Sequence, residues 1–79
     1  MNGIEEGMDI IIEVFKTNVD NHEDAQQIID ALSKLLNSIR VTIDLEDCDR
    51  VLRVEGKAFA VEEVTTVLHL HGFDCELLI

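Results

Sequence analysis

Residues 38–56 read SIRVTIDLEDCDRVLRVEG and hold two stretches in which apolar and polar residues alternate. Alternation with a period of two is typical of a β-strand that buries one face and exposes the other. A short polar break separates the two stretches, which favours an antiparallel hairpin. The residues expected to face inward are Ile39, Val41, Ile43, Leu45, Leu52 and Val54.

The register of this hairpin follows from its apolar faces, which must coincide. A tip at residues 48–49 places Leu45 opposite Leu52, and it places Asp44 opposite Arg53 on the outer face. Cys-Asp is not a favoured two-residue turn, so a longer or bulged loop is the alternative.

The segment before the hairpin predicts a strand followed by a helix. Residues 10–15, IIIEVF, are rich in β-branched residues, and we expect Ile10, Ile12 and Val14 to face the core. Residues 20–37 then change to a helical period, with Asn21 as N-cap and Asn37 at the end. The expected apolar stripe of this helix is Ala25, Ile28, Ile29, Leu32, Leu35 and Leu36.

The segment after the hairpin repeats that plan with a helix over residues 60–72 and a strand over residues 73–79. Gly72 suits the position just after the helix, where a left-handed conformation is common. The buried side of the helix is expected to include Val61, Val64, Val67 and Leu68, with His71 at its margin. The inward residues of the last strand are expected to be Phe73, Cys75, Leu77 and Ile79.

The order is therefore βαββαβ, which predicts an α+β fold. Right-handed crossovers place both helices on one face of a four-stranded antiparallel sheet of order 4-1-3-2, a ferredoxin-like two-layer sandwich. We expect one domain over residues 9–79, preceded by a flexible extension over residues 1–8.

Composition and charge exclude several classes of partner. The chain of 79 residues has 17 acidic and 6 basic side chains, so its formal net charge is −11. Such a surface repels phosphate backbones and anionic lipids, which argues against nucleic acid and membrane partners. The start of the chain lacks a secretory pattern, and the two cysteines are expected as separate thiols, so we expect a cytoplasmic protein.

The predicted elements over residues 9–79 resemble the heavy-metal-associated (HMA) domain family of small copper chaperones and metal-pump domains. The resemblance lies in the helix and strand that read IIDALSKLLNSIRVTIDLE. Members of that family bind copper or zinc through two cysteines separated by two residues in the loop and first helical turn. Asn21 and Asp24 stand at those positions here, and they cannot replace the soft thiolates that select cuprous copper. The chain also resembles short uncharacterised bacterial proteins that carry the strings EVFKTNV and DLEDCD.

Two groups of side chains are candidates for metal binding. Asn21, His22 and Asp24 could form a weak divalent site, although helix capping is the favoured interpretation. The hairpin acids match no EF-hand loop, so an acidic turn that discourages strand addition is favoured there. No cofactor is expected.

The open face of the predicted sheet is the candidate interface. The candidate residues there are Ile11, Phe15, Val51, Arg53 and Leu78. Large apolar side chains on an exposed sheet often mark an interface, and scattered apolar side chains on a solvated face are the alternative.

The sequence shows no catalytic motif, so we do not expect an enzyme. The leading hypothesis is a non-catalytic binding or self-association module, whose partner is an unknown protein or a second copy in a weak homodimer. The alternative is a weak metal-binding protein that uses Asn21, His22 and Asp24.

Overall fold

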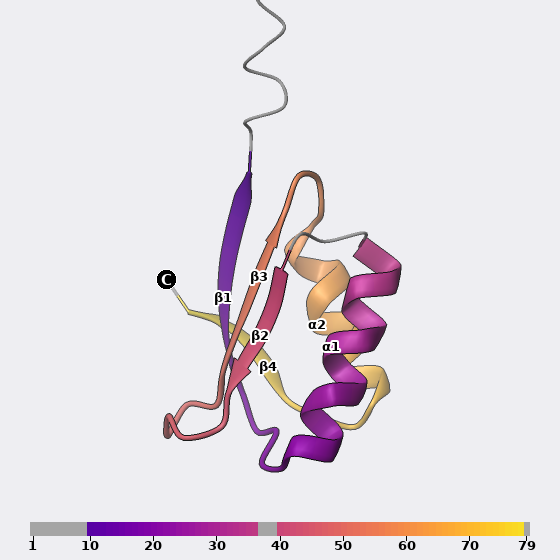
Figure 1. Cartoon of the computed structure of the whole chain (residues 1–79). Helices are drawn as coiled ribbons and strands as arrows, with labels where there is room; N and C mark the ends of the chain where they lie inside the picture. Colours follow the sequence, from indigo (N-terminus) through magenta and orange to yellow (C-terminus); the bar gives the residue numbers. More distant parts are fainter. Residues whose placement is uncertain (1–9, 37–39, 79) are drawn as a thin grey trace, which may run out of the picture.

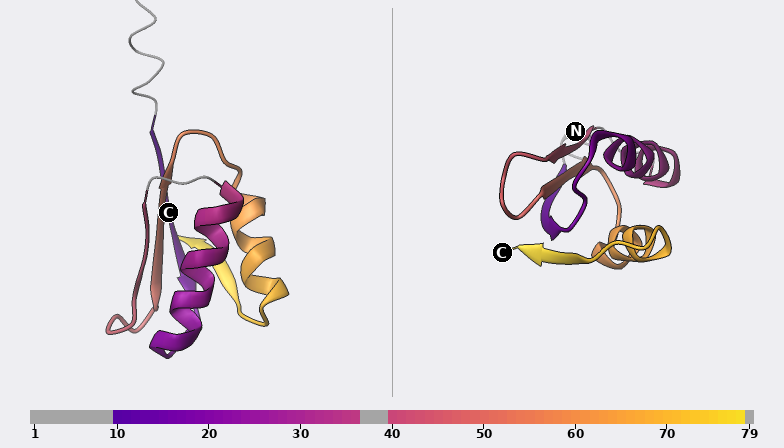
Figure 2. Two further views of the ribbon diagram at one scale, coloured as in Figure 1. Left: turned by 45° about the vertical axis from the view of Figure 1, so that its right-hand side comes forward. Right: turned by 90° about the horizontal axis from the view of Figure 1, so that it is seen from below.

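The computed structural model describes residues 10–36 and 40–78, in which two helices cover one face of a four-stranded sheet (Figures 1 and 2). The element order is β1 (Ile11–Thr17), α1 (His22–Leu36), β2 (Arg40–Asp44), β3 (Val51–Gly56), α2 (Val61–Leu70) and β4 (Cys75–Leu78). All paired strands are antiparallel, in the order β2-β3-β1-β4. Read from the β4 edge, this is the order 4-1-3-2. The architecture is α+β and is compatible with a ferredoxin-like sandwich.

Several expectations concern residues outside the described ranges. These are the flexible extension over residues 1–8, the helix end at Asn37, and the inward positions of Ile39 and Ile79.

The β2–β3 hairpin keeps the expected faces but not the expected register. Ile43 lies opposite Leu52, and Val41 lies opposite Val54, so the predicted pairing of Leu45 with Leu52 was wrong by two residues. A shift of two preserves the faces because strand side chains alternate with a period of two. Leu52 and Val54 are fully buried, as predicted.

The Asp44–Arg53 pairing fails for the same reason. Asp44 lies opposite Val51, and Thr42 lies opposite Arg53. Asp44 and Arg53 are both exposed on the outer face, as expected. Arg53 instead pairs along its own strand, where its Nε donates to Glu55 at 3.0 Å.

The loop between β2 and β3 is longer than two residues, which sets the observed register. The Asp44 carboxylate accepts a hydrogen bond from the backbone N–H of Glu46 at 3.0 Å. The Asp47 carboxylate accepts one from Asp49 at 2.8 Å, and the Asp47 carbonyl accepts one from the Arg50 N–H at 2.9 Å. Arg50 then turns the chain at a φ of 45°. The acidic side chains therefore close this loop on its own backbone.

The alternation of β1 is opposite to the one predicted, and this is the main correction to the fold. Phe15 is fully buried, whereas Ile12 retains 48% exposure and Ile10 retains 46%. Phe15 lies opposite Leu52 and Leu77, whose side chains are in the core or packed against it. The sequence IIIEVF is apolar on both faces, so its alternation alone could not choose between them.

The buried side chains form one core between the sheet and the helices. The α1 stripe is confirmed except for Leu35, which is 59% exposed, and the α2 side is confirmed except for His71, which is exposed. Val19, in the connection from β1 to α1, is fully buried and was not predicted. The core consists of Phe15, Val19, Ala25, Ile28, Leu32, Val41, Leu52, Val54, Val64, Val67, Leu68 and Cys75.

Helix α2 ends at Leu70, and Gly72 follows the cap residue His71 at the C′ position, as the sequence predicts. This glycine has a φ of 89°, and its N–H donates to the His69 carbonyl at 2.9 Å. The Phe73 N–H donates to the Leu68 carbonyl, also at 2.9 Å. These two bonds form a Schellman motif, which satisfies the last carbonyls of the helix and directs the chain into β4.

We expect Phe15→Ala to lower the free energy of unfolding by about 3–5 kcal/mol, because it removes a fully buried ring from the core. That loss is a large share of the about 5–15 kcal/mol typical of a folded domain. Ile12→Ala on the same strand is the control, since Ile12 is half exposed, and its cost should stay below about 1 kcal/mol. Urea unfolding followed by circular dichroism measures both, and equal costs would contradict the assigned faces of β1.

Candidate functional site

The N-terminus of α1 holds the three residues considered for a weak metal site. Asn21 Oδ1 accepts a hydrogen bond from the Asp24 backbone N–H at 2.8 Å, and Asn21 Nδ2 donates to the Asp24 carboxylate at 2.9 Å. His22 between them is exposed. Asn21 is therefore the N-cap of α1, as the sequence favours, and its amide is engaged on both sides.

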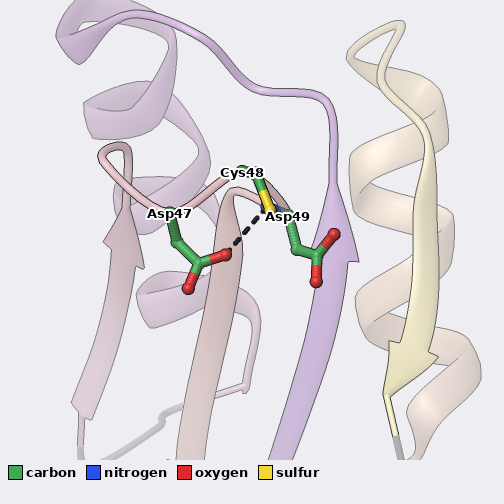
Figure 3. Close-up of side chains that lie close together, drawn as sticks. All are labelled: Asp47, Cys48 and Asp49. Atoms are coloured by element: carbon green, nitrogen blue, oxygen red, sulfur yellow. Dashed lines mark hydrogen bonds between the residues drawn. The ribbon is translucent and has the colours of Figure 1, made fainter.

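The loop after β2 holds a second group with metal-ligand chemistry, Asp47, Cys48 and Asp49 (Figure 3). One ligand atom from each lies within 4.8 Å of the others, and within residues 10–36 and 40–78 no other group of three His, Cys, Asp or Glu side chains does so. The Asp47 carboxylate is occupied by the Asp49 N–H, and Lys16 Nζ lies 3.9 Å from Asp49 Oδ1. The Asp47 carboxylate therefore closes the loop, and the Asp49 carboxylate pairs with a lysine, so both have roles that need no metal ion.

The same loop is attached to the central strand through Thr17. The Thr17 N–H donates to the Asp49 carbonyl at 3.0 Å, and its hydroxyl donates to the Arg50 carbonyl at 2.7 Å. Thr17 is buried, and its hydroxyl also accepts from the Val19 N–H at 3.3 Å. The acidic loop is thus fixed to the end of β1.

The two cysteines are separate free thiols, as predicted. Cys48 is exposed in the loop, whereas Cys75 is buried in β4. Burial raises the pKa of the Cys75 thiol to about 11, because the low-polarity interior disfavours the thiolate. Cys75 is therefore a core residue with little nucleophilic character at neutral pH.

The open face is the side of the sheet that the helices leave uncovered (Figure 2). We define it by the residues that alternate with the buried positions of each strand. Strands β1 and β4 contribute Ile12, Val14, Lys16, Glu76 and Leu78. Strands β2 and β3 contribute Arg40, Thr42, Asp44, Val51, Arg53 and Glu55.

Three of the five predicted interface candidates lie on the open face, namely Val51, Arg53 and Leu78. The other two were wrong. Phe15 is fully buried beneath the helices, and Ile11 shares its side of β1 and is half-buried.

Ile12 and Val14 take their place, and sequence reasoning had assigned both to the core. The signal that could have found them lies beyond the strand. Phe15, Thr17 and Val19 are every second residue, and all three are buried. Because Val19 must be buried where the chain leads into α1, the same alternation places Phe15 in the core.

Three of the four apolar side chains of the open face, Ile12, Val14 and Leu78, are adjacent, whereas Val51 lies opposite Asp44. Val14 lies opposite Leu78 on β4 and opposite Arg53 on β3, and Ile12 follows on the same face of β1. Ile12 is 48% exposed, which is high for a large apolar side chain on a central strand. The face therefore has a partly exposed apolar strip along β1 that continues onto β4, where Leu78 is half-buried.

The charged side chains around this strip have neighbours of opposite charge on the adjacent strand or on their own strand. Arg40 lies opposite Glu55, and Glu55 accepts from Arg53. Lys16 lies opposite Glu76. Side chains of opposite charge therefore flank the apolar strip.

Comparison of the chain with family models, with curated proteins and with solved structures finds no match.

In the part of the chain that the structure describes, neither helix is long and apolar enough to cross a membrane.

We expect Asn21→Ala to lower the free energy of unfolding by about 0.5–2 kcal/mol, because the N–H of Asp24 loses its acceptor. His22→Ala is the matched control and should leave stability unchanged, since His22 is exposed. Chemical unfolding with and without zinc measures both effects. Stabilisation by zinc that disappears in His22→Ala would contradict the capping role and support the metal alternative.

We expect one thiol per chain to react with Ellman's reagent at pH 8 in the folded protein, and two after unfolding. Cys48 is exposed, whereas Cys75, with its pKa at about 11, has about one thiolate in a thousand at that pH and is also buried. Cys48→Ser should abolish the fast reaction, and Cys75→Ser should leave it unchanged. Fast modification of Cys75 in the folded chain would contradict its position in the core.

Proposed function

We propose that the chain is a non-catalytic binding or self-association module whose contact surface is the open face. The observation that carries this proposal is the apolar strip of Ile12, Val14 and Leu78 on an acidic domain, in which Ile12 is exposed, Val14 and Leu78 are half-buried, and charged side chains flank all three. Interfaces commonly combine an apolar centre with a polar rim. The strip and its flanking charges have that composition.

The strength of such contacts is limited by the size of the strip. Fully burying a side chain such as Val or Leu contributes about 1.5–3 kcal/mol, and the costs of association reduce the sum. Ile12 retains 48% exposure, and Val14 and Leu78 are half-buried, so the gain from each is smaller than that of a fully exposed side chain. We therefore propose reversible rather than permanent association.

We further propose that the chain is a divergent relative of the HMA domains in which Asn21 and Asp24 replace the thiolate pair. Both residues support the end of a helix here, which is a structural role. The free cysteines fit a reducing compartment such as the cytoplasm, and the net charge of −11 argues against nucleic acid as the partner.

We expect a photo-cross-linking amino acid at position 12 to give discrete protein adducts in extracts of the native host. The same amino acid at position 70 is the control, because Leu70 is apolar and 80% exposed but lies on α2. Gel electrophoresis and mass spectrometry separate adducts with a second copy from adducts with another protein. Absence of adducts at position 12, or the same adducts at both positions, would contradict a binding role for the open face.

A further inference from the structure

The charges of the chain are distributed unevenly between the open face and the rest of the molecule. Lys16, Arg40 and Arg53 on this face are balanced by three acidic residues, Asp44, Glu55 and Glu76. The remaining three basic residues face fourteen acidic ones elsewhere in the chain. Asp49 of the neighbouring loop adds a fourth carboxylate at the edge of the face, 3.9 Å from Lys16 Nζ. The open face is therefore close to neutral, so it is where two copies of an acidic protein meet with little local repulsion.

Strand β2 carries opposite charges at its two ends. Arg40 and Asp44 share the open face and are four residues apart, which is about 13 Å along a strand. They are too far apart to pair within one chain. A second β2 that runs in the opposite direction across the face would bring each charge against its opposite.

A two-fold axis that crosses the strands at Val14 gives this arrangement. It places Val14 against Val14 of the partner subunit and Leu78 against Leu78 of the partner subunit, because both occupy one row of the sheet. Arg53 lies in the same row and therefore faces Arg53 of the partner subunit. Each guanidinium is already paired with Glu55 of its own chain at 3.0 Å, which offsets the repulsion between these two like charges. Face-to-face sheets pack within about 30° of alignment, so the strand ends remain near each other.

We infer that the open face binds a second copy of this chain, with Arg40 of each copy against Asp44 of the partner subunit. This inference rests on the proposed function of the open face as a contact surface.

The area of the face sets the stability of such a dimer. Four strands spaced about 4.8 Å apart and about 5–6 residues long cover about 350 Å². A standard stable interface buries about 800 Å² per partner. The dimer is therefore reversible, and it strengthens from low to moderate salt as the net charge of each copy is screened.

Charge reversal tests this arrangement by sedimentation equilibrium at moderate salt and up to millimolar protein. We expect Arg40→Asp and Asp44→Arg each to weaken the dimer about tenfold, because each puts like charges together twice. The double variant keeps the net charge of −11 and should restore wild-type association. Asp44→Arg is the sharpest test, since it lowers the net negative charge and would strengthen a dimer limited by repulsion alone.

Matched controls change the same net charge on the helical side. Lys34→Asp and Asp30→Arg lie at exposed positions of α1 and should alter association by less than about twofold. The Asp44 carboxylate also accepts from Glu46, so circular dichroism checks each variant for folding. If Asp44→Arg does not fold, Asp44→Asn keeps an acceptor and should still weaken the dimer.

The outcomes separate the inference from the proposed function. A monomer under all these conditions, or a dimer that Asp44→Arg does not weaken, overturns the inferred arrangement. If cross-links at position 12 then reach only another protein, the open face remains a binding surface. If position 12 gives no adduct of either kind, the proposed function fails as well.

Discussion

The burial of Phe15 is the constraint on which the rest of the structure depends. Its ring is fully buried on the central strand β1, between Leu52 of β3 and Leu77 of β4. Because alternate side chains point to opposite faces, placing this ring under the helices puts Ile12 and Val14 on the open face. The burial of Phe15 therefore determines both which residues of β1 enter the core and which lie on the candidate contact surface.

The acidic residues have two distinct structural roles. Some are local acceptors, as in the loop where Asp44 and Asp47 bind backbone N–H groups. Others, such as Asp30 and Glu62, lie exposed on the helices. Carboxylate clusters in this sequence thus close a loop or form an acidic outer surface. On the open face of the sheet, by contrast, basic and acidic side chains are present in nearly equal numbers.

Local features of the fold could be predicted from the sequence because their causes are local. The Asn21 cap and the Gly72 end of α2 each depend on a few neighbouring residues. The register of β2 and β3 could not be predicted, because it depends on how a six-residue loop folds around its own carboxylates. The face of Phe15 could not be read from IIIEVF alone, because both sides of this stretch are apolar and the buried residues Thr17 and Val19, which continue the alternation of Phe15, lie beyond it. The open-face positions of Val51, Arg53 and Leu78 were predicted correctly, because apolar and polar residues alternate clearly in β3 and β4. The positions of Ile11 and Phe15 on β1 were predicted on the wrong face.

The position of β1 at the centre of the sheet bears on how the chain folds. This strand comes first among the four, yet its neighbours β3 and β4 follow about 40 and 60 residues later in the sequence. Pairing across such separations requires closing long loops before β1 makes any sheet contact, and this loop entropy slows folding relative to helical proteins of the same size. During synthesis on a ribosome β1 emerges before both of its neighbours. Until β3 and β4 follow, the Phe15 ring and both edges of the strand are open to chaperones and to unwanted strand pairing.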